Sequence, residues 1–88
     1  MKSGIELIAE ERREQIEKHG YDLVHDLDHE ADGELIVAAQ AAILGNDAAF
    51  PAKWELVAVQ KICDKPLKER LVIAGALIAA ELDRLNNL

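Results

Sequence analysis

The side chains best suited to chemistry in this chain are acids and histidines between residues 25 and 34. Seven such residues fall in this short stretch: His25, Asp26, Asp28, His29, Glu30, Asp32 and Glu34. Carboxylate oxygens are the ligands that Mg²⁺ and Mn²⁺ prefer in proteins. Two histidines four residues apart, such as His25 and His29, would instead suit a zinc site. The pattern therefore points to a divalent cation close to residue 30.

The distribution of charge also favours a cation as the partner of this stretch. The chain has 17 acids against 10 lysines and arginines, which gives a net charge of −7. No lysine or arginine occurs between Lys18 and Lys53, and the seven acids in that gap account for the whole imbalance. A basic face for nucleic acid is therefore disfavoured. A solvated acidic loop and helix start would explain the same charges without any ligand.

Several kinds of catalytic site are excluded by residues that the chain lacks. Ser3 is the only serine, there is no threonine, and Cys63 is the only cysteine. An internal disulfide and a zinc ribbon are therefore ruled out, serine-type catalysis is strongly disfavoured, and Cys63 is expected to be a small core residue. An EF-hand loop beginning at Asp28 would need an acid at its twelfth position, where Ala39 stands. A reducing cytoplasm is the natural location, and catalysis would require carboxylates, histidines or a metal.

The elements that must position these residues are predicted to be helices. Half of the 88 residues are hydrophobic, but only 3% are aromatic, and glycine and proline are scarce. That composition favours a single all-α domain over a sandwich or a barrel. The spacing of apolar residues predicts three long helices and a short one, over 4–19, about 28–44, about 66–86 and, for the short helix, 54–63. In a helix that has started by residue 30, Glu30 and Glu34 lie on one face.

Two of the predicted helices are apolar on nearly all sides. Residues 35–44 are interrupted only by Gln40, and the last helix carries a main stripe of Leu67, Leu71, Ala74, Gly75, Ile78, Leu82 and Leu85 with further apolar residues beside it. A lone bundle of this size would leave one such face in water. We therefore expect a homo-oligomer, most simply a dimer, that completes the bundle. Gly75 in mid-helix indicates close approach of another backbone. The apolar runs are too short for a membrane helix.

The last predicted helix can bring a third carboxylate, Glu81, to the acidic stretch. On a helical wheel Glu81 lies at the edge of the main stripe, so it would either bind the cation or pair with Arg84 or Arg70. The single tryptophan, Trp54, would cover the edge of the core or stack on a base.

The chain resembles small helical proteins encoded by bacteriophages and prophages. The resemblance spans nearly the whole chain, and its most specific part is the closing run from Ala74 to Leu85. It rests on Glu11-Arg12-Arg13, Gln15-Ile16, Lys18, Gly20, His25-Asp26, Gly33-Glu34-Leu35, Ala38-Ala39, Trp54 and Ala74-Gly75-Ala76-Leu77-Ile78-Ala79-Ala80-Glu81-Leu82-Asp83-Arg84-Leu85. The layout is distantly similar to the all-α nucleotide pyrophosphohydrolases of the MazG type.

In that superfamily a helix with the motif Glu-Glu-x-Gly-Glu-Leu and a later acidic helix bind Mg²⁺, and the enzymes are dimers or tetramers. Glu30 and Glu34 match the first motif, with Gly33 and Leu35 in register, whereas Ala31 replaces its second glutamate. The later motif, Glu-x-x-Asp, has no clean counterpart, because Arg84 stands three places after Glu81.

Two hypotheses follow from the residues and the resemblance. In the first, Glu30, Glu34 and Glu81 hold Mg²⁺ or Mn²⁺, with Asp28 or His25 as further ligands, and the cation activates water against a nucleotide. Glu34 and Glu30 would be the catalytic residues. The substrate would be bound by Lys18, Arg70, Arg84 and Trp54. In the second hypothesis, the protein is a non-enzymatic helical oligomer that binds a protein partner.

Overall fold

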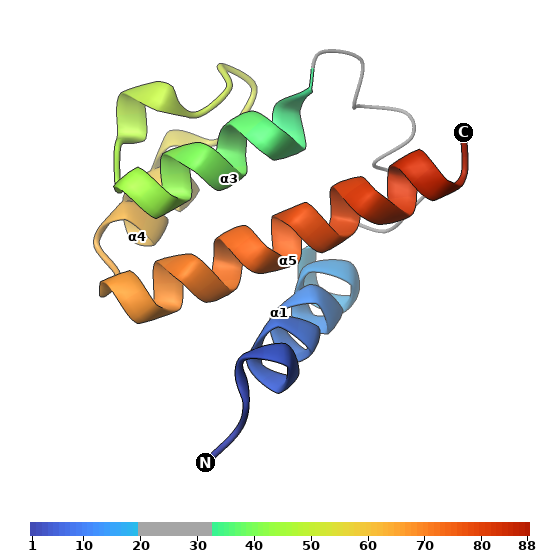
Figure 1. The fold of residues 1–88 in the computed structure, drawn as a ribbon. Helices are drawn as coiled ribbons and strands as arrows, with labels where there is room; N and C mark the ends of the chain where they lie inside the picture. The colour runs from blue at the N-terminus through green and yellow to red at the C-terminus, as the bar shows by residue number, and fades with distance from the viewer. Residues whose placement is uncertain (20–32) are drawn as a thin grey trace.

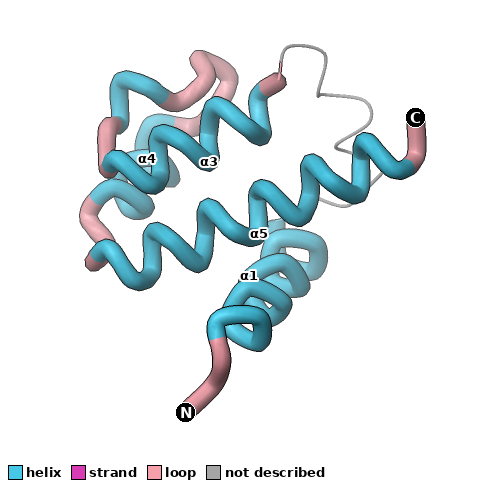
Figure 2. Tube along the Cα trace, viewed as in Figure 1, coloured by secondary structure: helices cyan, strands magenta, loops and turns pink. Residues whose placement is uncertain are grey.

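The computed structural model describes residues 1–19 and 33–88, and all the regular secondary structure in these ranges is helical. Its elements are α1 (Gly4–His19), α3 (Glu34–Leu44), the short 3-10 helix η1 (Asp47–Ala49), α4 (Leu56–Cys63) and α5 (Leu67–Asn86). Short loops without strands join the helices from α3 onward (Figure 2). The expected all-α class, with three long helices and a short one, is confirmed for this part of the chain.

The longest helix, α5, is the centre of the fold. Helix α3 packs along one side of α5, and α1 crosses another side near the middle of α5 (Figure 1). Helices α3 and α5 are antiparallel, because Arg70 near the start of α5 reaches the carbonyls of Ala42 and Ile43 at the end of α3. Any side chain near the start of α3 therefore lies toward the C-terminal half of α5.

Alanines line much of the contact between α3 and α5. The core is a cluster of buried apolar residues, namely Leu35, Ala38, Ala39, Ala41, Ala42, Phe50, Val59, Ile73, Ala74, Leu77 and Ala80. Small side chains allow two helix backbones to approach closely, so little volume is needed to fill the space between them. Among the residues that the structure describes, Leu77 is the largest side chain that is completely enclosed.

The ends of the helices agree with local signals in the sequence. Helix α1 spans the predicted residues, and Ser3 and Glu6 form a reciprocal capping box: each backbone N–H donates to the other side chain, at 3.1 and 3.2 Å. Helix α3 ends at Gly45, which adopts a left-handed conformation with φ 67°. Helix α5 begins directly after Pro66.

The prediction for the start of the second helix was wrong. We expected this helix to begin near residue 28, but α3 begins at Glu34, because Gly33 is left-handed with φ 71°. A left-handed residue cannot continue a right-handed helix. Glu34 is thus the first residue of its helix, and the expected position of Glu30 on the same face concerns a residue outside the described ranges.

The predicted main stripe of α5 is largely exposed to solvent. Its leucines and isoleucine, Leu67, Leu71, Ile78, Leu82 and Leu85, are each 47–56% exposed, while Ala74 is buried. The core side of α5 instead comprises Ile73, Ala74, Ala76, Leu77, Ala80 and Glu81. At Gly75 a Cβ atom would lie 2.6 Å from the Cδ1 of Ile8, so this glycine makes room for an α1 side chain rather than for another backbone.

The helices of the described ranges were compared with the length and hydrophobicity of a membrane-spanning helix. None of these helices is long and apolar enough to cross a bilayer.

Candidate functional site

The predicted site residues fall into two groups. His25, Asp28 and Glu30, with the neighbouring Asp26 and His29, lie outside the described residues. The structure does place the others: Lys18, Glu34, Trp54, Arg70, Glu81 and Arg84.

Glu34 is the first residue of α3, directly after the left-handed Gly33. Its side chain is 15% exposed, and one carboxylate oxygen lies 3.4 Å from the Nζ atom of Lys53. A negative charge is stabilised at this position, because the first N–H groups of a helix point toward it and carry partial positive charge. Lys53 is a cation of the site that sequence reasoning missed, because its contact joins two distant segments.

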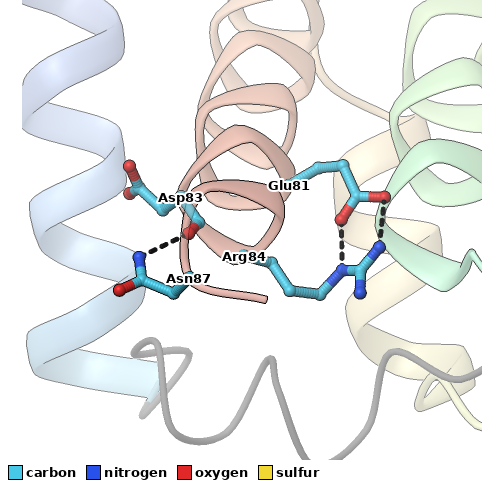
Figure 3. A network of polar contacts seen from close by, with 4 residues as sticks. All are labelled: Glu81, Asp83, Arg84 and Asn87. Carbon is cyan, nitrogen blue, oxygen red and sulfur yellow. Dashed lines mark hydrogen bonds and ion pairs between the residues drawn. The ribbon is translucent and has the colours of Figure 1, made fainter.

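Glu81 is buried on α5 and is held by Arg84 three residues later. The Nε atom of Arg84 donates to Oε1 of Glu81 at 2.5 Å, and one terminal nitrogen donates to Oε2 at 3.3 Å. Figure 3 shows this pair on one side of α5, with Asp83 on the other. The side chains of Arg84 and Glu81 are 17% and 7% exposed, so the pair is mostly shielded from water. The alternative in which Glu81 pairs with Arg84 is therefore what the structure contains.

Glu34 and Glu81 lie at about the same level of the antiparallel pair. Starting from the contact between Ile43 and Arg70, Glu34 is nine residues back along α3 and Glu81 is eleven residues forward along α5. At a rise of 1.5 Å per residue these steps are about 14 and about 17 Å in the same direction. Two largely buried carboxylates from different helices therefore lie toward one end of the fold, next to the point where the acid-rich segment joins α3.

Arg70 has a structural contact at the opposite end of α3. Its guanidinium donates to the carbonyls of Ala42, Ile43 and Lys65, at 3.4, 2.9 and 3.0 Å. The carbonyls at the end of a helix have no partner within the helix, so Arg70 acts as a cap from another helix. This guanidinium is about 15 Å of helix length away from the two carboxylates.

Lys18, the other cation predicted to bind substrate, lies on the surface of α1. Its Nζ atom is 2.8 Å from Oε1 of Glu14, one turn earlier. The hydrogen bond to Glu14 and the negative charge of that carboxylate raise the pKa of Lys18. The ammonium group therefore stays protonated, but its contact is a local one within α1.

Trp54 covers the edge of the core, as expected. It packs against the buried cluster, and its ring lies 5.4 Å from that of Phe50 at an angle of 52°. The same side chain also lines a cleft between α1 and α4.

Cys63 is a packing residue at the end of α4. It is partly buried against the core cluster. Burial is the main reason that the pKa of Cys63 is raised, and the carboxylate of Asp47 adds to it. A raised pKa leaves less thiolate at neutral pH, which is the opposite of what an activated nucleophile needs.

Within residues 1–19 and 33–88 there is no group of three or more metal-ligand side chains. The described site is thus a pair of carboxylates, Glu34 and Glu81, each matched with one cation. Comparisons with known protein families, curated proteins and solved structures give no match to this chain.

Proposed function

We propose that this protein is a Mg²⁺-dependent nucleoside triphosphate pyrophosphohydrolase. Glu34 and Glu81 would hold the cation, together with Glu30, Asp28 or His25 from the segment that leads into α3. Mg²⁺ prefers carboxylate oxygens, and when bound it neutralises phosphate charge and activates water. Mn²⁺ offers the same chemistry.

The observation that carries the proposal is the common level of Glu34 and Glu81 on the antiparallel helices. Each carboxylate is shielded from solvent, and each already attracts positive charge. The Lys53–Glu34 pair is weak, because the side chain of Lys53 is 67% exposed. A divalent cation can replace this partner at little cost, whereas replacing Arg84 costs a bidentate ion pair.

The two displaced cations have a role in the same proposal. Arg84 would turn from Glu81 toward the phosphates of the substrate, as the sequence analysis predicted for it, and Lys53 would do the same from the loop before α4. Arginine suits this task because its planar donors match phosphate oxygens in pairs. The positive charge would then stabilise the transition state as negative charge builds on the leaving pyrophosphate.

The experiment is a pyrophosphate-release assay with several nucleoside triphosphates and Mg²⁺. We expect turnover by the wild type, with Glu34→Gln and Glu81→Gln each reducing kcat/KM by at least 100-fold. Asp83→Asn is the matched control, because it removes the same charge from the other side of α5 (Figure 3). Absence of turnover by wild-type protein with every nucleotide tested, or equal loss in the Asp83→Asn variant, would overturn the proposal.

A second proposal concerns the exposed face of α5, defined by Leu67, Leu71, Ile78, Leu82 and Leu85. We propose that a second copy of the chain covers this face. Five half-exposed side chains offer roughly 450 Å² of apolar surface, a patch within the range of about 300–600 Å² that is often a binding surface. Two such faces bury roughly 900 Å² together, and exposed apolar residues of α3 such as Ile36 and Ile43 would bring the interface toward the ~1,200 Å² of stable dimers.

Sedimentation equilibrium tests this dimer. We expect the wild type at twice the chain mass of 9.7 kDa and Leu82→Lys at the mass of one chain. Leu56→Lys is the control, since Leu56 is also exposed but belongs to α4. A wild-type protein that sediments as a monomer at all concentrations would refute the interface.

A further inference from the structure

A cleft between α1 and α4 is not used by the proposed metal site. Both helices flank α5, and they leave a cavity of about 280 Å³ between them. Ile62 and Leu77 contribute apolar surface to it, and Trp54 provides an aromatic wall. The polar lining comes from Gln15 on α1, and from Lys61 and Lys65 at the end of α4.

Gln15 is an unusual residue in this lining because its polar atom has no partner. The residue is only 4% exposed, and its Oε1 accepts no hydrogen bond in the described structure. A buried acceptor without a donor loses its hydrogen bonds to water and gains none, so such atoms are rare and call for an explanation. Rotation about the last side-chain torsion, which has a broad energy profile, can turn this oxygen into the cleft. The cleft thus offers an acceptor to a ligand that carries an N–H group.

The unpaired charge of the lining is positive. Lys61 and Lys65 are four residues apart and both line the cleft, and within residues 1–19 and 33–88 neither ammonium group forms an ion pair. Glu11 and Glu14 line the opposite wall, but Glu14 is engaged by Lys18 at 2.8 Å and Glu11 is not free either. The complementary ligand therefore has an anionic group for the two lysines.

Trp54 and the apolar surface specify the rest of the ligand. An indole ring beside aliphatic side chains favours a flat ring in the ligand, because a base stacks on an aromatic side chain. This cavity of about 280 Å³ is slightly smaller than most ligand sites, which run from about 300 to 1,000 Å³. It suits one mononucleotide rather than a larger cofactor.

We propose that this cleft binds a purine mononucleotide. The base would lie against Trp54 and donate an N–H to Oε1 of Gln15, and the phosphate would contact Lys61 and Lys65. A nucleoside monophosphate is also a product of the proposed hydrolysis, but binding in this cleft needs neither the metal nor Glu34 and Glu81, so the two proposals are tested separately.

The fluorescence of Trp54 reports on the site directly, because it is the only tryptophan. We expect AMP or GMP, titrated in the presence of EDTA, to change this emission to saturation. Adenosine and ribose 5-phosphate should each bind at least tenfold more weakly, since each lacks one of the recognised groups. The Lys61→Met/Lys65→Met variant should also lose at least tenfold in affinity. Lys68→Met is the matched control, because Lys68 lies on α5 outside this cleft.

Three outcomes would overturn the proposal. The first is no change of emission with AMP or GMP at concentrations on the order of 5 mM, where even weak specific binding is detected. The second is unaltered affinity in the double lysine variant. The third is ribose 5-phosphate binding as tightly as AMP, which would show that the base is not recognised. Because EDTA removes divalent cations, none of these results depends on whether the protein hydrolyses triphosphates.

Discussion

Replacing Arg84 by methionine should destabilise the fold and expose Glu81 to metal ions. The side chains of Arg84 and Glu81 are 17% and 7% exposed, and Arg84 donates two hydrogen bonds to the carboxylate of Glu81. Its removal leaves a carboxylate shielded from water without its cation, which costs about 3 kcal/mol. That is a large part of the 5–15 kcal/mol that stabilises a typical domain.

Urea unfolding followed by circular dichroism measures this cost. With a slope of about 1 kcal/mol per molar urea for a small domain, the midpoint should fall by about 3 M. The variant Glu81→Met/Arg84→Met should recover most of the loss, because an apolar pair of similar volume replaces the ion pair without leaving a charge behind. This second variant also keeps the comparison measurable if Arg84→Met alone is largely unfolded in buffer.

Magnesium connects the same variant to the proposed function. A ligand at a concentration 100 times its Kd stabilises the folded state by about 2.7 kcal/mol. Mg²⁺ should therefore raise the midpoint of Arg84→Met far more than NaCl of equal ionic strength, and it should do little for Glu81→Met/Arg84→Met. The reasoning is refuted if Arg84→Met costs less than about 0.5 kcal/mol, a value typical of an exposed pair. It is equally refuted if Mg²⁺ stabilises both variants alike.

Three further predictions concern the frame that holds the site. Gly45→Ala should lower the unfolding free energy by about 2 kcal/mol or more, because the residue has φ 67° and its Cβ would lie 2.6 Å from the guanidinium of Arg70; an unchanged urea midpoint would contradict the capping geometry. Ser3→Ala should cost about 1 kcal/mol by breaking the capping box with Glu6, and a loss of protection from hydrogen exchange confined to the first turn of α1 would locate the effect. Because burial raises the pKa of Cys63, the native protein holds less thiolate than the unfolded chain at each pH below that pKa. Iodoacetamide should therefore modify the native protein more slowly than the unfolded chain, and the rate should still be rising at pH ~9. A rate that levels off below pH ~8.5 would be contrary to burial of the thiol.

The parts of the fold that depend on neighbouring residues were predictable from the sequence. The capping box at Ser3, the glycine at Gly45 and the proline at Pro66 are local signals, and the helices begin or end at them. Gly33 shows the limit of such signals. A glycine can continue a helix or adopt a left-handed conformation, and only the second state places the start of α3 at Glu34.

The side of α5 that would be buried could not be predicted, because apolar residues surround this helix. Packing selected the side with Ala74, Ala76 and Ala80, whose small side chains suit close contact with other helices, and left the larger Leu82 outside. In such a sequence the spacing of apolar residues does not indicate which side of the helix is buried.

The candidate site shows the same division. The pairing of Glu81 with Arg84 was one of the alternatives that the spacing allowed, because the two residues are three apart on one helix. The contact between Lys53 and Glu34 and the capping of α3 by Arg70 join distant segments, so no sequence pattern indicated them. The cytoplasmic location and the resemblance to phage and prophage proteins stay predictions.

Binding of Mn²⁺, followed by electron paramagnetic resonance, tests most directly whether Glu34 and Glu81 share one divalent cation. The spectrum of free Mn²⁺ should diminish as wild-type protein is added, with one ion bound per chain and with Mg²⁺ as a competitor. Glu34→Gln and Glu81→Gln should each weaken this binding at least tenfold, while Asp83→Asn leaves it unchanged. Equal affinity in the wild type and both glutamine variants would contradict a shared site.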